Sequence, residues 1–362
     1  MFANDLRSTA ADYAAFGEAF AAALNDKDQS ALSELFAVAE FTRAIADDLF
    51  DDDEAKRDFL RGFRGDSQAA FVSILFHSWF SQELSAKYLR TMDRNRPVVR
   101  VNFVNGGLEY ILISMREVAG ELVAVDLYLM TAGRTLSASA GLASQIMLKP
   151  SNALLTRLFG EDYRANQPMA AKFRLIGELR REGDLQGAYD LIQSLPDSVR
   201  DNRLMVDTAV QLTSHLDETE YRKQLTRLGT LYGDDESAGL TLINYYLTTG
   251  DYDKAESTIN RLVRFLGEDA ALANIQAVVA MDAKKYELAE QYGLRAIELE
   301  PDFEDAYWTL VTIALEQRNF DGVTVGLQRL EKVFNYEFTP DGFDPEVFGQ
   351  YTQSESMKKW LQ

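Results

Sequence analysis

A motif made of a turn, an aromatic residue and a small residue recurs at a fixed interval in the C-terminal half of the chain. Gly250-Asp251-Tyr252-Asp253-Lys254-Ala255 is followed 34 residues later by Lys284-Lys285-Tyr286-Glu287-Leu288-Ala289, and after 34 more by Arg318-Asn319-Phe320-Asp321-Gly322-Val323. Each motif is typical of the turn that opens the second helix of a helical hairpin. A constant period of this length indicates stacked copies of one supersecondary unit, because each unit buries its apolar face only against its neighbours.

These motifs resemble those of tetratricopeptide (TPR) repeats, and the tail is similar to the ends of bacterial TPR proteins. The resemblance implies an all-α solenoid over residues 168–337, with five helical hairpins of which the second, about 202–235, is degenerate. Small residues are expected where two helices cross, because they let the backbones approach. These positions hold Ala188, Ala255, Ala289 and, in the last unit, Val323. Residues 338–362 are predicted to cap the last apolar face, through Phe343, Phe348, Tyr351 and Trp360.

In TPR proteins the first helix of each unit lines a concave groove that holds a partner peptide. The lysines of the chaperone-binding subclass are absent here, which argues against recognition of a chaperone tail and favours a hydrophobic helix or an extended segment. An alternative is that the protein's own chain covers part of this groove. Carried over residue by residue, the resemblance implies a groove lined by Leu240, Asn244, Leu247, Asn274, Val278, Met281, Trp308 and Thr312.

The N-terminal part, residues 1–150, changes its hydrophobic period along the chain. Helical spacing predicts a series of helices that ends in a buried helix over residues 67–89. After Pro97 the period changes to two, and Gly106-Gly107 and Ala119-Gly120 mark turns, which predicts a three-stranded antiparallel meander. The predicted fold is therefore α+β, joined through a linker helix over 151–167 to the solenoid. The stretch AFGEAFAAALNDKDQSALSELF is similar to the start of NTF2-like domains, which curve such a sheet around a pocket.

One face of the predicted sheet mixes polar and apolar side chains. If both loops have two residues, Arg100 and Asp126 flank Ile113 on this face and lie about 10 Å apart, at about 4.8 Å per strand. The opposite face is apolar, with Val99, Val101, Phe103, Tyr110, Leu112, Val123, Val125, Leu127 and Leu129. Two interpretations of the mixed face are open, a half-solvated surface or a ligand pocket. The pocket would use Arg100, Asn102, Asp126 and Tyr128.

The charge balance limits the classes of partner. The chain has 37 basic and 57 acidic residues, a formal net charge of −20, without a cluster of lysines or arginines. Nucleic-acid binding therefore lacks an electrostatic footprint, and basic or apolar partners are favoured. No run of 18 or more apolar residues occurs, so no membrane span is predicted. The chain is expected to be cytoplasmic if Met1 is its native start, and periplasmic or secreted if a leader was removed.

The sequence favours an interaction protein over an enzyme. It contains no cysteine, only two histidines far apart, and no phosphate loop, nucleophile elbow or zinc-binding helix motif. No cofactor and no metal site are predicted. The leading hypothesis is a non-enzymatic scaffold or adaptor that binds a protein or peptide in the groove of the solenoid. The alternative is a small-molecule receptor or enzyme that uses the sheet face, with the repeats serving for docking or dimerisation. The oligomeric state stays open.

Overall fold

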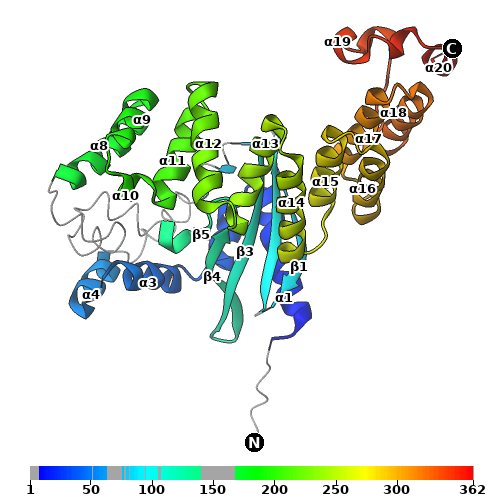
Figure 1. Cartoon of the computed structure of the whole chain (residues 1–362). Coiled ribbons are helices and arrows are strands. Elements are labelled where there is room, and N and C mark those ends of the chain that lie inside the picture. Colours follow the sequence, from blue (N-terminus) through cyan, green and yellow to red (C-terminus); the bar gives the residue numbers. More distant parts are fainter. Residues whose placement is uncertain are drawn as a thin grey trace, which may run out of the picture. The chain divides into compact units, whose positions relative to one another are not determined.

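The chain begins with short helices, continues through an antiparallel sheet and ends in a long series of helices (Figure 1). The computed structural model describes residues 8–50, 52–62, 76, 79–80, 82–93, 95–104, 107–139 and 168–361. The chain divides into two units, Met1–Leu240 and Thr241–Gln362, and each is described by itself. The predicted linker helix over 151–167 lies outside the described residues.

Among the described residues, four named helices precede the sheet, and the starts of the first two follow from local capping. Thr9 begins the first helix with a capping box, because its side chain accepts from the Asp12 backbone while Asp12 accepts from the Thr9 backbone. Asp28 caps the second helix by accepting hydrogen bonds from the backbone of Ser30 and Ala31. The helices are α1 (Ala10–Asn25), α2 (Gln29–Leu35), α3 (Val38–Leu49) and α4 (Asp53–Gly62).

The described sheet has five antiparallel strands in the order β1-β2-β3-β4-β5, so the prediction of three strands is wrong. Its strands are β1 (Leu84–Met92), β2 (Arg96–Phe103), β3 (Gly107–Val118), β4 (Glu121–Leu129) and β5 (Arg134–Thr135). β1 falls partly inside the helix predicted over 67–89. Exposed and buried positions alternate only over Leu84–Tyr88, and a bulge between Tyr88 and Arg90 then interrupts the pattern, which leaves too short a period to distinguish a strand from a buried helix. β5 has two residues and is too short to show a period.

The predicted register between β2 and β3 is also wrong. Phe103 pairs with Gly107, so the loop between these strands has three residues instead of two. The predicted turn at Gly106-Gly107 would place Phe103 opposite Tyr110, so the register differs by three residues. An odd shift moves every side chain of β3 to the other face of the sheet. Ile111 and Ile113 consequently lie on the core face. The second turn is as predicted: Val118 pairs with Glu121, and Ala119 and Gly120 both have positive φ, as a type I′ turn requires.

Both faces of the sheet contribute to buried structure. On one face Val99, Val101, Ile111, Ile113 and Leu127 form a hydrophobic cluster with side chains of the N-terminal helices, which include Phe16, Phe20, Leu24, Leu32, Phe36 and Phe41. The opposite face is also covered, since its Val98, Arg100, Tyr110 and Leu112 are buried. The mixed face predicted from the sequence is therefore not a half-solvated surface around Arg100.

The first unit continues into helices that make a polar contact with the end of the sheet. The elements are α8 (Pro168–Glu182), α9 (Leu185–Gln193), α10 (Asp197–Arg200), α11 (Arg203–Thr213), α12 (Glu218–Tyr232) and η2 (Glu236–Ala238). Asp207 of α11 lies 3.5 Å from Arg134 of β5 and 2.7 Å from Arg203. Arg203 also donates to Ser237, at 3.0 Å. These contacts tie β5 to α11 and η2.

The second unit contains the helices with the strongest sequence period. The division between the units falls within α13 (Gly239–Thr249). It is followed by α14 (Tyr252–Leu266), α15 (Ala270–Asp282), α16 (Tyr286–Leu299), α17 (Glu304–Glu316) and α18 (Phe320–Phe334). The C-terminal elements are η3 (Pro340–Gly342), α19 (Pro345–Phe348), η4 (Tyr351–Gln353) and α20 (Glu355–Trp360). α15 contacts α14, α16 and α17, and α17 contacts α18.

The turn between paired helices has the same geometry three times in succession. Gly250, Lys284 and Arg318 have φ of 73°, 59° and 56°, all in the left-handed region. In each turn the next amide donates to the carbonyl five residues back, as from Asp251 to Tyr246, at 2.8 Å in all three. A hydrogen bond of this kind, next to a residue in the left-handed conformation, typically ends a helix at its C-terminus. α14, α16 and α18 therefore begin at residues 252, 286 and 320, with the predicted 34-residue spacing.

Candidate functional site

The residues predicted to line a groove lie on α13, α15 and α17, and here they are called the first-helix row. Asn274, Val278 and Met281 of α15 are spaced by four and three residues, which places them on one face of the helix. Asn244 of α13 and Thr312 of α17 are exposed. The half-buried members are Leu240, Leu247, Asn274, Val278, Met281 and Trp308. The row thus combines accessible polar groups with partly accessible apolar ones.

The side-chain oxygen of Asn274 has no hydrogen-bond donor in the described part of the chain. Its Oδ1 is buried and accepts no hydrogen bond from the described residues. The nearby Gln276 instead donates to Asn260, at 2.9 Å. A buried polar atom normally has a hydrogen-bond partner. The Asn274 oxygen is itself buried, so in this structure the exposed polar groups of the row belong to Asn244 and Thr312.

Trp308 is partly covered by the protein's own chain. The rings of Tyr336 and Phe338 lie edge-on to it, with centroids 5.7 and 6.1 Å from that of Trp308. The Trp308 indole donates to Oε1 of Glu304, at 3.0 Å, and the Tyr336 hydroxyl donates to the same oxygen, at 2.5 Å. A truncation at Trp308 would consequently remove packing within the chain as well as any contact with a partner.

The rest of the C-terminal segment packs on the last helix pair. Tyr351 is fully buried, and its hydroxyl is 2.9 Å from that of Thr324 on α18. Phe343 lies within ring contact of Phe338, Phe348, Tyr351 and Trp360. These residues join a hydrophobic cluster with Tyr307, Val311, Val323, Leu327 and Leu330 of α17 and α18.

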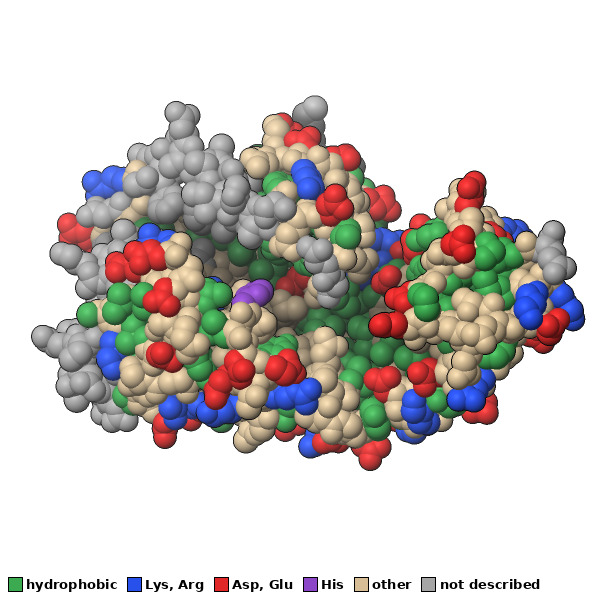
Figure 2. All heavy atoms as spheres, turned by 90° about the horizontal axis from the view of Figure 1, so that it is seen from above, with side chains coloured by type: hydrophobic (Ala, Val, Ile, Leu, Met, Phe, Trp, Pro, Cys, Tyr) green, Lys and Arg blue, Asp and Glu red, His purple; other side chains and the backbone are tan. Residues whose placement is uncertain are grey.

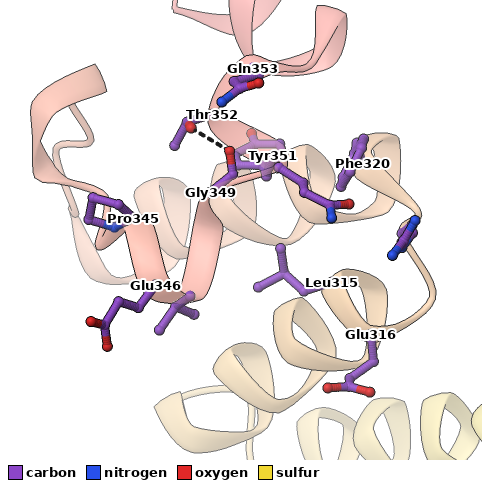
Figure 3. Close-up of a pocket in the computed structure, with 12 residues that line it drawn as sticks. Leu315, Glu316, Phe320, Pro345, Glu346, Gly349, Tyr351, Thr352 and Gln353 are labelled. Carbon is purple, nitrogen blue, oxygen red and sulfur yellow. Dashed lines mark hydrogen bonds between the residues drawn. The ribbon is translucent and has the colours of Figure 1, made fainter.

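A cleft of about 600 Å³ lies between the α17–α18 turn and the C-terminal segment. Figure 3 shows Leu315 and Phe320 from the two helices, and Pro345, Glu346 and Tyr351 from the segment. Arg318, Gln350 and Gln353 add polar groups to the lining, a composition that suits a polar chain better than an apolar ligand. Sequence reasoning missed this cleft, because it depends on how the tail folds back.

The four residues of the predicted sheet pocket do not converge. Arg100 is opposite Tyr110, and Asp126 is opposite Ser114, so the two are offset by four residues along β3. That offset places their Cα atoms roughly 16 Å apart at about 3.3 Å per residue and 4.8 Å per strand. Arg100 is 1% exposed, whereas Asn102 and Tyr128 are half-buried.

Hydrogen bonds within the fold engage the carboxylate of Asp126. Its Oδ1 accepts from the backbone of Leu127, at 2.8 Å, and from the backbone of Ser137, at 3.1 Å. The Ser137 hydroxyl donates to Oδ2. Satisfied lone pairs of this kind stabilise the connection after β5. Asp126 therefore has a structural explanation that does not require a ligand.

A buried acid that sequence reasoning overlooked lies at the start of β3. The side chain of Glu109 is 6% exposed and accepts from the backbone of Tyr110 and Thr131, at 2.9 and 3.0 Å. The Thr131 hydroxyl donates to its other oxygen. Burial raises the pKa of Glu109, although these hydrogen bonds oppose the shift. The signal in the sequence was a lone acid at an inward-facing position of a strand.

The surface of the described residues carries both signs of charge. Acidic and basic side chains are interspersed over the face in Figure 2, with hydrophobic side chains between them. Within the described ranges, no three histidine or acidic side chains gather closely enough to hold a metal ion. None of the helices that the structure describes combines the length and the apolar character needed to cross a bilayer.

Comparisons with known proteins found limited similarity. No protein-family model matches the chain. The Sol locus transcriptional repressor of Clostridium acetobutylicum is 25% identical over 125 residues, which cover 34% of this chain and 38% of that protein. Among solved structures, PilW, a widely conserved type IV pilus biogenesis factor, aligns with 54% of this chain and 100% of its own, with a TM-score of 0.37 and 14% identity.

Proposed function

We propose that the chain is a non-enzymatic protein-interaction module of the TPR type, which binds a peptide or helix of a partner along the first-helix row. The observation that carries this proposal is the triple recurrence of one turn geometry, at Gly250, Lys284 and Arg318, between helices that begin 34 residues apart. Repeats of this kind place equivalent side chains of successive first helices side by side. The contact between α15 and α17 supports that arrangement.

The chemistry of the row favours a partner segment with an apolar face. Val278 and Met281 are half-buried and offer apolar contacts, whereas the amide of Asn244 is exposed and that of Asn274 is half-buried. Apolar anchors supply most of the affinity in helix-in-groove recognition, and amides bind the polar edge of the partner. Each amide hydrogen bond is worth about 1 kcal/mol.

The alternative function, a receptor or enzyme that uses the sheet, has weaker support. Arg100, Tyr110 and Leu112 are buried on the face that would hold the ligand, and the carboxylate of Asp126 is engaged by Ser137 and Leu127. Likewise, we propose protein binding in preference to nucleic-acid binding because the formal net charge is −20.

Affinity capture with matched variants tests the proposal. Wild-type chain, a row variant (Asn244→Arg with Thr312→Arg) and an outer-face control (Gln291→Arg with Gln328→Arg) are incubated with lysate of the native host. All four substituted positions are exposed, so both variants should keep the fold. Mass spectrometry and nucleic-acid staining then identify what each chain retains.

We expect a protein that is retained by the wild-type chain and by the outer-face control but is lost by the row variant. Equal retention by all three chains would reject the first-helix row as the binding surface. Retention of nucleic acid that survives in both variants would reject protein binding as the main function.

A further inference from the structure

The aromatic cluster at the end of the first-helix row lies beside a carboxylate that has no cationic partner among the described residues. The cluster consists of Trp308, Tyr336 and Phe338. The rings of Tyr336 and Phe338 are stacked, with their centroids 5.5 Å apart and an angle of 8° between their planes. Tyr336 keeps 38% of its surface exposed. Glu304, in the first turn of α17, lies next to this cluster and accepts one hydrogen bond from Trp308 and one from Tyr336.

The two hydrogen bonds to Glu304 leave one oxygen open. Both donors, the Trp308 indole and the Tyr336 hydroxyl, reach Oε1. Oε2 receives neither a hydrogen bond nor an ion pair from the residues that the structure describes, and both donors to Oε1 are neutral. The negative charge of Glu304 is thus held in place without being neutralised. The hydrogen bond from Tyr336 also raises the pKa of that hydroxyl, because it stabilises the protonated phenol.

We propose that the aromatic cluster and Glu304 together bind an arginine side chain of the partner protein, an inference that rests on the proposed function. A guanidinium stacks on an aromatic face and donates in its own plane to a carboxylate oxygen, which a compact ammonium group does less well. Tyr336, which keeps 38% of its surface exposed, supplies the aromatic surface, and Oε2 of Glu304 supplies the acceptor. The excess of 57 acidic over 37 basic residues in the chain favours approach of a cationic partner.

A small probe tests this site without knowledge of the partner. The full chain contains three tryptophans, so labelling with 5-fluorotryptophan gives three fluorine signals, assigned by replacing each tryptophan with phenylalanine. Nα-acetyl-arginine amide is titrated in, and Nα-acetyl-citrulline amide, which is neutral and nearly isosteric, is the control ligand. Trp79, which lies in the first unit, acts as the internal control for the fold, whereas Trp360 contacts Phe338 of the cluster and does not serve as a control.

The expected result is a saturable shift of the Trp308 signal with the arginine probe, at a dissociation constant on the order of millimolar, and no such shift with citrulline. Glu304→Gln should weaken binding at least about fivefold, as loss of a charged acceptor predicts. Glu337→Gln removes an equal charge from an exposed neighbour of Tyr336 and should leave binding unchanged. Tyr336→Leu, which removes the aromatic face, should weaken binding and decides the question if Glu304→Gln fails to fold.

Equal shifts with arginine and citrulline, unchanged affinity in Glu304→Gln, or equal loss in Glu337→Gln would overturn the inference. The proposed function is tested separately, with the partner obtained by affinity capture. If Glu304→Gln still retains that partner while the row variant loses it, only the arginine site is rejected. If both variants retain it, the proposed function is rejected as well.

Discussion

Gly17 of α1 packs directly against the ring of Tyr88 on β1, so that a Cβ at residue 17 would lie 2.3 Å from Cδ2 of the ring. The ring has little freedom to move, because its hydroxyl is held 2.9 Å from that of Thr91. Glycine at this position therefore sets how closely α1 approaches the edge strand of the sheet.

We expect Gly17→Ala to destabilise the protein by up to about 2 kcal/mol net, because overpacking a tight contact costs about 1–3 kcal/mol. Helix propensity alone would act in the opposite direction, with a gain of about 1 kcal/mol. Ala19→Gly, at an exposed position of the same helix, calibrates that propensity and should lose about 1 kcal/mol. Urea denaturation measures both changes, and a stabilised Gly17→Ala variant would show that Tyr88 does not restrict the position.

The repeated turns make a prediction of opposite sign. Arg318 adopts φ of 56°, a conformation that favours glycine, and the equivalent residue of an earlier turn is Gly250. Arg318→Gly should stabilise the second unit by up to about 1 kcal/mol, since it relieves the left-handed strain. Arg318→Ala keeps the strain and should be nearly neutral. Thermal melts compare the two variants, and equal stability would mean that the backbone at residue 318 is not strained.

The position at which α15 and α16 cross, Ala289, should tolerate only a small side chain. Ala289 is fully buried in a cluster with Ala280 and Ile313. Ala289→Leu should lower the free energy of unfolding by about 1–3 kcal/mol, because the added carbons force the helices apart. Gln291→Leu adds an apolar side chain at an exposed position of α16 and serves as the matched control. If chemical denaturation finds the two variants equally stable, Ala289 does not occupy a close helix crossing.

Glu109 gives the first unit a distinct pH dependence. Burial raises the pKa of Glu109 in the folded state above 4.5, the ordinary value of a glutamate side chain, so the folded state binds the proton more tightly than the unfolded state does. Its contribution to stability is therefore fully present below pH 4.5 and is lost as pH rises through the raised folded pKa. Glu109→Gln, which keeps acceptor and donor groups, should be more stable relative to wild type at pH 7 than at pH 4. Urea titrations at both values check this, and an equal difference at the two would contradict it.

The parts of the fold that depend on local chemistry followed from the sequence. The starts of α14, α16 and α18 were predictable, because Gly250 and its two equivalents close each turn through neighbouring residues. The five-stranded sheet was not. The face of Ile111 depends on whether one loop has two or three residues, and glycine composition does not decide between them.

The sequence likewise predicted one part of the candidate site and not the other. The TPR resemblance implied that Asn274, Val278 and Met281 line one face of a helix, and their spacing along α15 agrees with this. It did not reveal that Tyr336 and Phe338 cover Trp308, because that contact depends on how a tail of irregular structure folds back onto α17. The buried acceptor of Asn274 likewise became visible only once the neighbouring helices were in place.

The central claim is that a partner binds along the first-helix row. Hydrogen exchange of the full chain, read by mass spectrometry with and without the captured partner, tests it most directly because it reports on every backbone segment at once. We predict slower exchange in α13, α15 and α17, centred on peptides that contain Asn244 and Asn274, with β1–β5 unchanged. Protection confined to the strands around Arg100 and Asp126 would contradict the account and assign binding to the sheet.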